Sequence, residues 1–415
     1  MNMPHIAVIG AGIAGATTAY SLLDRGYRVT VIDRQRYAAM ETSFANGGQL
    51  SASNAEVWNR WSTVLKGMRW MLRRDAPLLV NPKPSWHKAS WMVEFLHAIR
   101  NYEANTIATT RLAIEARRHL FAMAEREGID FDAERRGILH IYESRSELAH
   151  ARDVNRLLWR GGLERREVGP DEVREIEPTL TQPLVGGFFT PSDCTGDIHK
   201  FTRGLVEACE RRGAAFLCGQ GVDALHAGAS GVRAAVGGDL LTFDALVIAA
   251  GVGSRALASQ VGDRINVYPV KGYSITVPLS DEASREAAPW VSLLDDGTKV
   301  VTSRLGNDRF RVAGTAEFNG FNRDIRSDRI RPLVDWVEKH FPQVDTSGAV
   351  PWAGLRPMMP DMMPRMGPGR HERVFYNTGH GHLGWTLSGA TAQIVADAVQ
   401  TRLPIPRSHP VRLAA

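Results

Sequence analysis

The chain has 415 residues, of which 44% are hydrophobic and 23% charged, and its formal net charge is +5. This length predicts two domains with cores of their own, and so small a net charge argues against a nucleic-acid-binding protein. The three cysteines, Cys194, Cys209 and Cys218, form no CxxC pair, so we expect neither a metal site nor a disulfide framework.

The first 33 residues predict a dinucleotide-binding unit. The apolar run 5–9 has strand composition, Gly10, Gly12 and Gly15 follow at the spacing GxGxxG, and a helical segment covers 14–25. A second apolar run ends on Asp33. In such a βαβ unit the glycines let the pyrophosphate approach the backbone, and the helix N-terminus faces its charge. The acid accepts hydrogen bonds from a ribose.

The segment 34–50, RQRYAAMETSFANGGQL, predicts a loop with a turn at 46–48. The hydroxyls of Thr42 and Ser43 can donate to phosphate oxygens, and Gly47 and Gly48 can bring backbone N–H groups to a ligand. The alternative is an ordinary polar loop.

Residues 57–100 contain five of the ten tryptophans and eight Lys or Arg residues, against two acids. Trp61, Leu65, Met68 and Leu72 fall at helical spacing, which predicts an amphipathic helix. A basic, tryptophan-rich surface can lie on an anionic bilayer; alternatively, the tryptophans pack inside. No apolar run reaches transmembrane length and the N-terminus lacks a basic n-region. We therefore expect a cytoplasmic protein, either free or peripheral on the inner face of the cytoplasmic membrane.

The rest of the chain alternates between helical and strand patterns. Helices are predicted at 88–127, 144–160, 198–213 (with Asp197 as N-cap), 328–340 and up to 402, and strands at 137–142 and 245–251. Residues 265–316 predict an antiparallel sheet, and the last dozen residues a loose tail. We expect an α/β (α+β) protein: a discontinuous Rossmann-like cofactor domain (1–56, 186–256 and 346–415) and a substrate domain (57–185 and 257–345) with an antiparallel sheet and helices.

Seven stretches resemble the glycine oxidase and D-amino acid oxidase family of FAD-dependent oxidoreductases, and within it the bacterial D-amino acid dehydrogenases. They are VIGAGIAGATTAYSL, VIDR, ETSFANGGQLS, SDCTGD, YPVKGYS, AGLRPMMPD and NTGHGHLGWTLS, in the family's order over nearly the whole chain. One loop departs from the family: MMPDMMPRMG stands where PMTPDGTP is more usual, at a place expected to influence substrate choice.

The resemblance implies FAD as the cofactor and assigns the positions that hold it. The ADP part would contact the first glycine turn and the acid that follows, and the remaining positions would contact pyrophosphate, adenine and flavin. These positions are Gly10, Ala11, Gly12, Ile13, Ala14, Gly15, Asp33, Arg34, Thr42, Ser43, Gly47, Gly48, Gln49, Leu50, Val222, Ala250, Gly251, Gly381, His382, Leu383, Gly384, Trp385 and Thr386.

An amino-acid substrate needs a cation for its carboxylate, and arginine can bind that group through two parallel hydrogen bonds. Arg356, in GLRP, matches the family's carboxylate-binding arginine, and Arg304 is a second, weaker candidate. Tyr273 is expected either to bind the same carboxylate or to pack in the core. His380 and His382 could act in acid–base chemistry, although the glycine-rich HGHLGW favours backbone contact with the flavin.

The expected reaction is oxidation of a D-amino acid by hydride transfer from Cα to flavin N5, followed by hydrolysis to a 2-oxo acid and ammonia. The resemblance implies a quinone or another respiratory-chain acceptor. Two alternatives stay open: an oxygen-using oxidase of glycine, sarcosine or a cyclic amine such as D-proline or D-hydroxyproline, and a flavin-carrying subunit active only within a complex.

Overall fold

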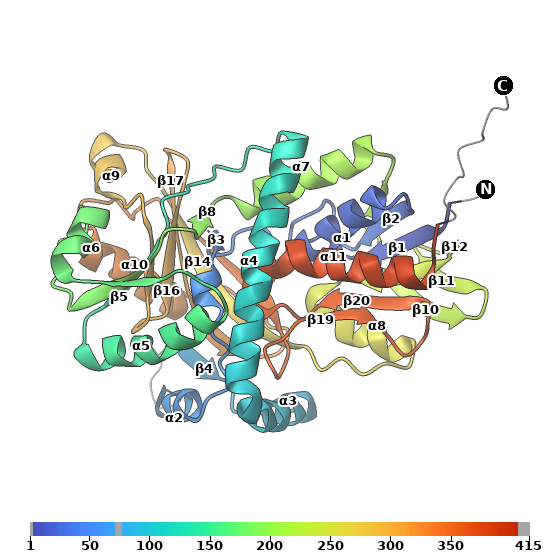
Figure 1. Ribbon diagram of the computed structural model, residues 1–415, viewed down its shortest axis with the longest axis horizontal. Coiled ribbons are helices and arrows are strands. Elements are labelled where there is room, and N and C mark those ends of the chain that lie inside the picture. Colours follow the sequence, from blue (N-terminus) through green and yellow to red (C-terminus); the bar gives the residue numbers. More distant parts are fainter. Residues whose placement is uncertain (1–2, 71–76, 406–415) are drawn as a thin grey trace.

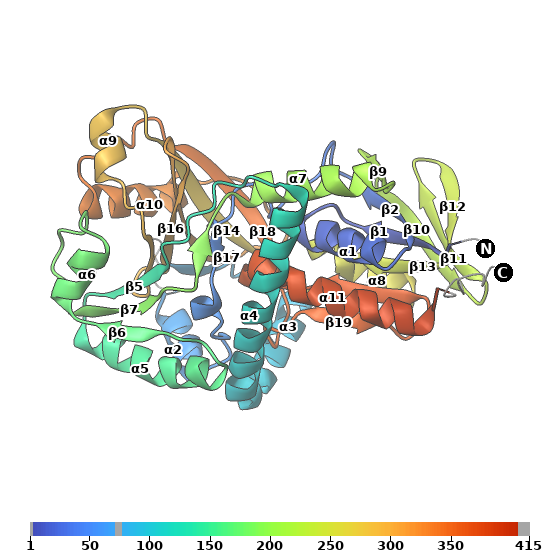
Figure 2. The same cartoon turned by 45° about the horizontal axis from the view of Figure 1, so that its top comes forward.

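The computed structural model describes residues 3–70 and 77–405, except the side chains of residues 66 and 68–70 (Figure 1). Two sheets lie at opposite ends of the long axis, and a long helix, α4 (Tyr102–Glu127), runs between them (Figures 1 and 2). The predicted tail at 406–415 and Leu72 lie outside the described residues.

The first sheet has six strands and contains the predicted βαβ unit. Five neighbouring strands are parallel, and β19 is antiparallel at one edge. In spatial order the strands are β19 (Arg365–Pro368), β20 (Val374–Thr378), β13 (Ala245–Ile248), β1 (His5–Ile9), β2 (Arg28–Asp33) and β9 (Ala215–Cys218).

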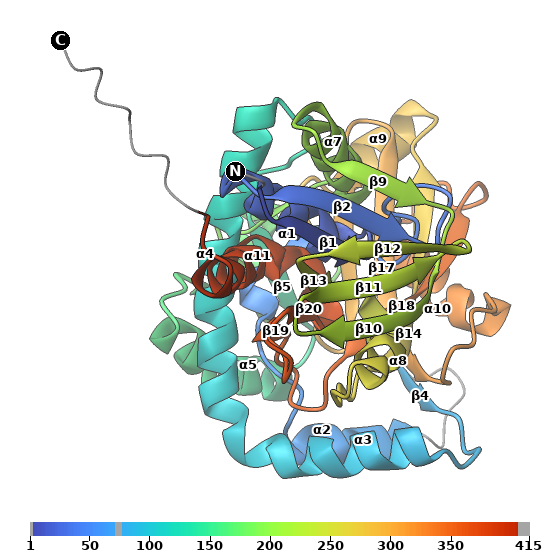
Figure 3. The ribbon, with the colours of Figure 1, turned by 90° about the vertical axis from the view of Figure 1, so that its right-hand side faces the viewer.

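Both faces of this sheet are covered, which explains the continuous apolar runs of its central strands. Alternate residues of β1, such as Ile6 and Val8, pack with α1 (Ile13–Asp24), α7 (Ile198–Arg211) and α11 (Gly384–Arg402). The residues between them, such as Ala7 and Ile9, pack against the other face. That face is covered by α8 (Ser254–Gln260) and by a three-stranded sheet of β10 (Val222–Gly228), β11 (Gly231–Val236) and β12 (Asp239–Phe243) (Figure 3).

The second sheet has nine strands and is mixed. The antiparallel pairing predicted for 265–316 holds for β14, β15, β16 and β17, and β18 adds to β14 in the same sense. In contrast, β5 pairs with β15, and β4 with β17, in parallel. The path is β18 (Val350–Met358), β14 (Tyr268–Pro278), β17 (Arg309–Phe318), β16 (Val300–Leu305), β15 (Ser292–Asp295), β5 (Ile138–Tyr142), β7 (Gly186–Thr190) and β6 (Arg166–Val168), with β4 (Leu78–Val80) beside β17.

Helix α10 (Ser327–His340) packs on one face of this sheet and forms a second core with it. The strands β7 and β18 belong to this sheet, although the predicted boundaries placed them in the cofactor domain. The division of the chain into two domains itself stays a prediction. The smaller helices of this half are α5 (Arg145–Arg160), α6 (Pro170–Ile176) and α9 (Glu282–Ala287).

The long helix α4 packs closely on α11, which belongs to the other half. A Cβ atom added at Gly389 of α11 would lie 2.5 Å from the carbonyl oxygen of Ala116, so this contact requires glycine. The predicted helix at 88–127 is divided in the structure into α3 (Trp86–His97), η2 (Ala98–Asn101) and α4. The predicted N-cap is confirmed, because the Asp197 carboxylate accepts hydrogen bonds from the backbone N–H groups of His199 and Lys200.

The tryptophan-rich segment folds into α2 (Trp61–Trp70), β4 and α3, with α2 and α3 along one edge of the molecule (Figure 3). Some of its tryptophans pack inside and others lie on the surface, so each of the two alternatives holds for part of the set. Trp91 is buried, whereas Trp61 is 62% and Trp86 83% exposed. Among residues 3–70 and 77–405, no helix has both the length and the apolar character needed to cross a bilayer.

Candidate active site

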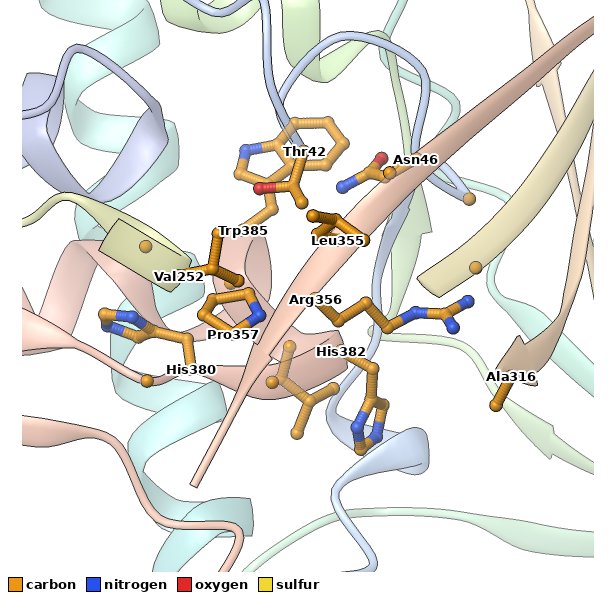
Figure 4. A pocket seen from close by; sticks show the side chains of 18 of the residues that line it. Thr42, Asn46, Val252, Ala316, Leu355, Arg356, Pro357, His380, His382 and Trp385 are labelled. Atoms are coloured by element: carbon orange, nitrogen blue, oxygen red, sulfur yellow. The ribbon is translucent and has the colours of Figure 1, made fainter. Parts of the chain in front are cut away.

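A large cavity of about 1200 Å³ lies where the two sheets meet. The glycine turn, the loop 39–49, the ends of β10 and β13, the strand β18 and the start of α11 all line it. Segments more than 300 residues apart in the sequence therefore form one wall (Figure 4).

The glycine turn at the N-terminus of α1 has the close packing expected of a dinucleotide site. Gly10 has φ +109°, and a Cβ atom there would lie 2.5 Å from the carbonyl oxygen of Ala249. A Cβ atom on Gly15 would lie 1.8 Å from the carbonyl oxygen of Gly10, so only glycine lets the helix approach the strand this closely. Gly12 is the N-cap residue and makes no side-chain hydrogen bond to the first turn of the helix. The helix N-terminus therefore faces the cavity.

Asp33 holds this turn in place from the end of β2. Its carboxylate accepts hydrogen bonds from the backbone N–H groups of Ala11 (2.6 Å) and Gln35 (2.7 Å), and burial raises its pKa. It also lines the cavity, where a ribose hydroxyl can reach it. The neighbouring Arg34 lines the cavity too and forms an ion pair with Glu41 at 2.9 Å.

The loop after β2 lies against the second sheet as well as the glycine turn. The Ser43 hydroxyl accepts a hydrogen bond from the backbone N–H of Ile13 at the start of α1. A Cβ atom on Gly47 would lie 2.7 Å from Cγ2 of Val301, and Gly48 has φ +70°. Glycine at these positions therefore keeps the loop close to the sheet.

The residues from Gly381 to Thr386 also line the cavity, as a 3₁₀ turn followed by the N-terminus of α11. Among the described residues that line the cavity, six buried polar atoms lack hydrogen-bond partners. Three of them belong to the segment from Asn377 to Thr386, namely Trp385 Nε1, His382 Nδ1 and Asn377 Oδ1, and the others are Arg165 Nε, Arg165 Nη1 and Thr315 Oγ1. Unsatisfied buried polar groups are costly, so these atoms point to a polar ligand. Together with the glycine cradle and the helix N-terminus, they fit a dinucleotide cofactor.

The structure places most of the predicted cofactor positions on the cavity wall, with three exceptions. Ala11, Gly15 and Leu50 do not line the cavity. The Ala11 N–H is taken by Asp33, Gly15 packs under the glycine turn, and Leu50 is buried in the core of the first sheet. The roles of the positions that line the cavity stay predictions.

Arg356 extends from β18 into the cavity (Figure 4). One guanidinium nitrogen, Nη1, donates to the carbonyl oxygen of Thr315 at 2.9 Å, and no carboxylate among the described residues forms an ion pair with it. A Cβ atom on Gly272 of the neighbouring strand β14 would lie 2.3 Å from Arg356 Cζ, so glycine makes room for the guanidinium. Burial lowers the pKa of Arg356 to about 10, which leaves the side chain charged at neutral pH. It is a buried cation available to an anionic ligand.

The two histidines differ in their surroundings, and Figure 4 shows His382 on the Arg356 side of the cavity and His380 on the other. The His380 imidazole lies 3.0 Å from the Thr391 hydroxyl, whereas His382 stacks on Trp58 at 4.9 Å. Burial lowers the pKa of each to about 4, and for His382 the charge of Arg356 adds to this effect. Both are therefore neutral at pH 7, and their acid–base role stays a prediction.

Tyr273 and Arg304 do not meet Arg356. Strand residues alternate between faces, so Tyr273, next to Gly272 on β14, packs with Leu333 of α10, and its hydroxyl donates to buried Glu317 at 2.7 Å. Arg304 does not line the cavity; it donates to four backbone carbonyls and stacks on Trp290 at 4.0 Å. Arg304 therefore lies outside the cavity, contrary to the prediction. Tyr273 lines the cavity although its hydroxyl is engaged by Glu317, and its contact with the substrate stays a prediction.

The sequence analysis missed a polar cluster on the cavity wall. His140 on β5 lies 3.0 Å from the Ser53 hydroxyl through Nε2 and 3.4 Å from Asp296 Oδ2 through Nδ1. The other Asp296 oxygen accepts from Lys299, whose backbone has a positive φ of 58°. The one sequence signal was a histidine inside the apolar strand GILHIY, since a buried histidine needs partners.

Comparisons with known proteins agree with this geometry. The family model described as FAD dependent oxidoreductase matches residues 5–398. D-amino acid dehydrogenase 3 of Mesorhizobium japonicum is 63% identical over 406 residues, which cover 97% of this chain and 98% of that protein. D-amino acid dehydrogenase of Dechloromonas aromatica is 40% identical over 414 residues, 97% of this chain and 98% of that protein.

Among solved structures, glycine oxidase from Geobacillus kaustophilus superposes with a TM-score of 0.73 at 22% identity, covering 96% of this chain and 95% of that one. L-proline dehydrogenase from P. horikoshii also gives a TM-score of 0.73, at 17% identity, over 96% and 94% of the two chains. At these identities the superpositions show a shared fold.

Proposed function

The chain belongs to the family of FAD-dependent oxidoreductases, and from this premise we propose that it oxidises D-amino acids to 2-oxo acids and ammonia. The names of its full-length relatives support this substrate class. The proposed electron acceptor is a quinone of the respiratory chain.

The observation that carries the proposal is that Arg356 is buried in the cavity without a carboxylate partner among the described residues. A buried guanidinium without a carboxylate partner is unfavourable unless a ligand supplies the anion. Thr315 takes one of its hydrogen bonds and Gly272 leaves room beside it, so the remaining N–H groups can bind an α-carboxylate. A flavin-carrying subunit without turnover of its own would not need this group.

Bound FAD supplies the hydride acceptor, flavin N5, for the Cα hydrogen of the substrate. The chain's own residues then have two tasks. Arg356 fixes the carboxylate, and with it the direction of the Cα–H bond. The N-terminus of α11, which lines the cavity, would offer positive partial charge to a bound flavin and so stabilise negative charge on its reduced form. Water hydrolyses the resulting imino acid.

The quinone proposal draws support from an apolar arm of the cavity beneath α2 and α3. Its lining side chains are Val64, Leu78, Val80, Trp91, Met92 and Phe95. The same two helices expose the large apolar side chains of Trp61, Leu65, Trp86, Val93 and Leu96. Such a surface suits peripheral contact with a membrane, where a quinone is dissolved.

A panel of D- and L-amino acids tests the proposed substrate class. We expect D-amino acids to reduce a quinone analogue or a redox dye, with little hydrogen peroxide formed in air. Turnover of L-enantiomers alone, or of no amino acid, would refute the substrate class. Efficient peroxide formation with glycine, sarcosine or D-proline would identify an oxidase instead.

Flotation with anionic vesicles tests the membrane contact. We expect the wild-type protein to float and a Trp61→Ser/Trp86→Ser variant to stay in the dense fraction. Trp159→Ser is the matched control, because Trp159 is 72% exposed but lies on α5 and not on α2 or α3. Equal flotation of all three proteins would contradict the proposed surface.

A further inference from the structure

Ser53, His140 and Asp296 form a hydrogen-bonded line on the cavity wall. They come from the 3₁₀ helix η1 (Ala52–Asn54), from β5 and from the turn after β15. The parallel pairing of β5 with β15 sets His140 opposite Leu294 and so brings Asp296 to the histidine. The two links measure 3.0 Å (Ser53 Oγ to His140 Nε2) and 3.4 Å (His140 Nδ1 to Asp296 Oδ2).

The ionised state of Asp296 determines which group donates in each of these two hydrogen bonds. Hydrogen bonds from His140 and Lys299, together with the Lys299 charge, hold the pKa of the Asp296 carboxyl well below its usual range, so this group is an ionised acceptor. His140 Nδ1 must therefore donate to it. That tautomer leaves Nε2 with its lone pair, and Nε2 accepts from the Ser53 hydroxyl. The imidazole is thus poised to take a proton through Ser53.

This line opens onto the part of the cavity that holds Arg356. Ser53, His140 and Asp296 all line the same cavity as the guanidinium. Asn54, next to Ser53, accepts a hydrogen bond from His382 at 3.3 Å, and the Arg356 charge acts on His382. A substrate whose carboxylate binds Arg356 has its amino group in this same cavity.

We propose that Ser53, His140 and Asp296 form a proton relay that deprotonates the ammonium group of the bound substrate. The inference rests on the proposed function. The ammonium N–H bond breaks and its proton goes to Ser53 Oγ, while the Ser53 hydroxyl proton goes to His140 Nε2. The products are a neutral amine, whose lone pair assists hydride loss from Cα, and an imidazolium stabilised by Asp296. The imidazolium returns its proton to water when the product leaves.

The charges around His140 suit this role. Arg165, before β6, acts with burial to lower the His140 pKa, whereas Asp296 and Asp193, which follows β7, act in the opposite direction. Tyr142, on the same strand, donates to Asp296, and Lys299 neutralises its other oxygen. The imidazole is therefore neutral at pH 7 in the absence of substrate and ready to accept a proton.

The test uses the FAD-loaded enzyme and follows kcat/KM for a D-amino acid from pH 5 to pH 10. We expect Ser53→Ala and His140→Gln to lose about 10²- to 10⁴-fold at pH 7, the usual range for a general base. Both should approach the wild type as the pH rises toward the pKa of the free substrate amine, because the amine is then already neutral. FAD content and thermal stability, measured in parallel, should stay close to wild type for Ser53→Ala.

The matched control is His340→Gln, because His340 is a second buried histidine, packed on Trp336 and away from the cavity. Its pH profile should match that of the wild type. The relay is refuted if Ser53→Ala and His140→Gln lose kcat/KM equally at every pH, or lose none. Turnover of D-amino acids by the wild type would in that case still support the proposed function. Failure of the wild type on every D-amino acid refutes both.

Discussion

Replacing Arg356 by methionine tests the centre of the proposed site. The substitution removes the charge and keeps most of the apolar stem. With one N–H group taken by Thr315, the guanidinium has about two hydrogen bonds to offer a carboxylate. A hydrogen bond to a charged group is worth about 1.5–3 kcal/mol, so kcat/KM should fall by roughly 10²- to 10⁴-fold.

The same substitution should not weaken the substrate-free protein. The pKa of Arg356 is lowered, to about 10, so the folded state disfavours the charged side chain, and this penalty is present at neutral pH and relieved only as the pH rises above about 10. Removing a buried charge that lacks a carboxylate partner should raise the free energy of unfolding by about 1–3 kcal/mol. For a chain of this length, that is roughly 1–3 °C in Tm.

Steady-state kinetics with dye reduction, the FAD absorbance ratio and a thermal melt measure these effects together. Arg304→Met is the matched control, because Arg304 is also a buried arginine but lies outside the cavity. It should lower Tm and leave kcat/KM of the folded enzyme unchanged. An Arg356→Met enzyme that keeps wild-type kcat/KM would refute the assignment of Arg356 to the substrate carboxylate.

Three further substitutions test the surroundings of the site. Gly272→Ala would place a Cβ atom 2.3 Å from Arg356 Cζ, so we expect KM to rise about 10- to 100-fold with FAD content unchanged; an unaltered KM would show that the guanidinium need not lie there. Burial raises the pKa of Asp33, so wild-type FAD affinity should weaken as the pH falls toward 4 and the carboxyl becomes protonated. Asp33→Asn should bind FAD about tenfold more weakly at pH 7 and lose that acid dependence, measured by fluorescence titration; equal affinities would contradict the role of the carboxylate. Tyr273→Phe removes the hydrogen bond to Glu317 and should cost about 1–2 kcal/mol of stability in a denaturant melt, with kcat/KM unchanged; a large loss of kcat/KM would return Tyr273 to the substrate site.

The parts of the fold with local signals were predictable from the sequence. The glycine turn, the acid at the end of β2 and the Asp197 cap each depend on residues only a few positions apart, so a short window contains the whole interaction. The assignment of β7 and β18 to a sheet could not be made in this way. Strand partners are chosen by long-range packing, and β7 pairs with β5 and β6, not with the strands of the first sheet.

The candidate site shows the same limit. Arg356 lines the cavity as expected, because its motif lies close in sequence to the glycine-rich segment that also lines the cavity. The packing of the Tyr273 side chain against α10 could not be foreseen, because a shift of one residue along a strand reverses the face and the bulge between Lys271 and Tyr273 opposite β17 is invisible in the sequence. The contact between His140 and Asp296 joins residues 156 positions apart, and neither residue stands in a recognisable motif.

The tight contact between α4 and α11 bears on how substrate enters and product leaves. With 26 residues, α4 is about 39 Å long, and at Gly389 it meets α11 without room for a methyl group. A rigid-body rotation of one half against the other would have to separate this contact. Exchange is therefore expected to proceed by local displacement at the rim, where the turn that carries Asp296 and Lys299 lies, instead of by hinge closure. In such an enzyme the distance between cofactor and substrate site stays fixed throughout the catalytic cycle.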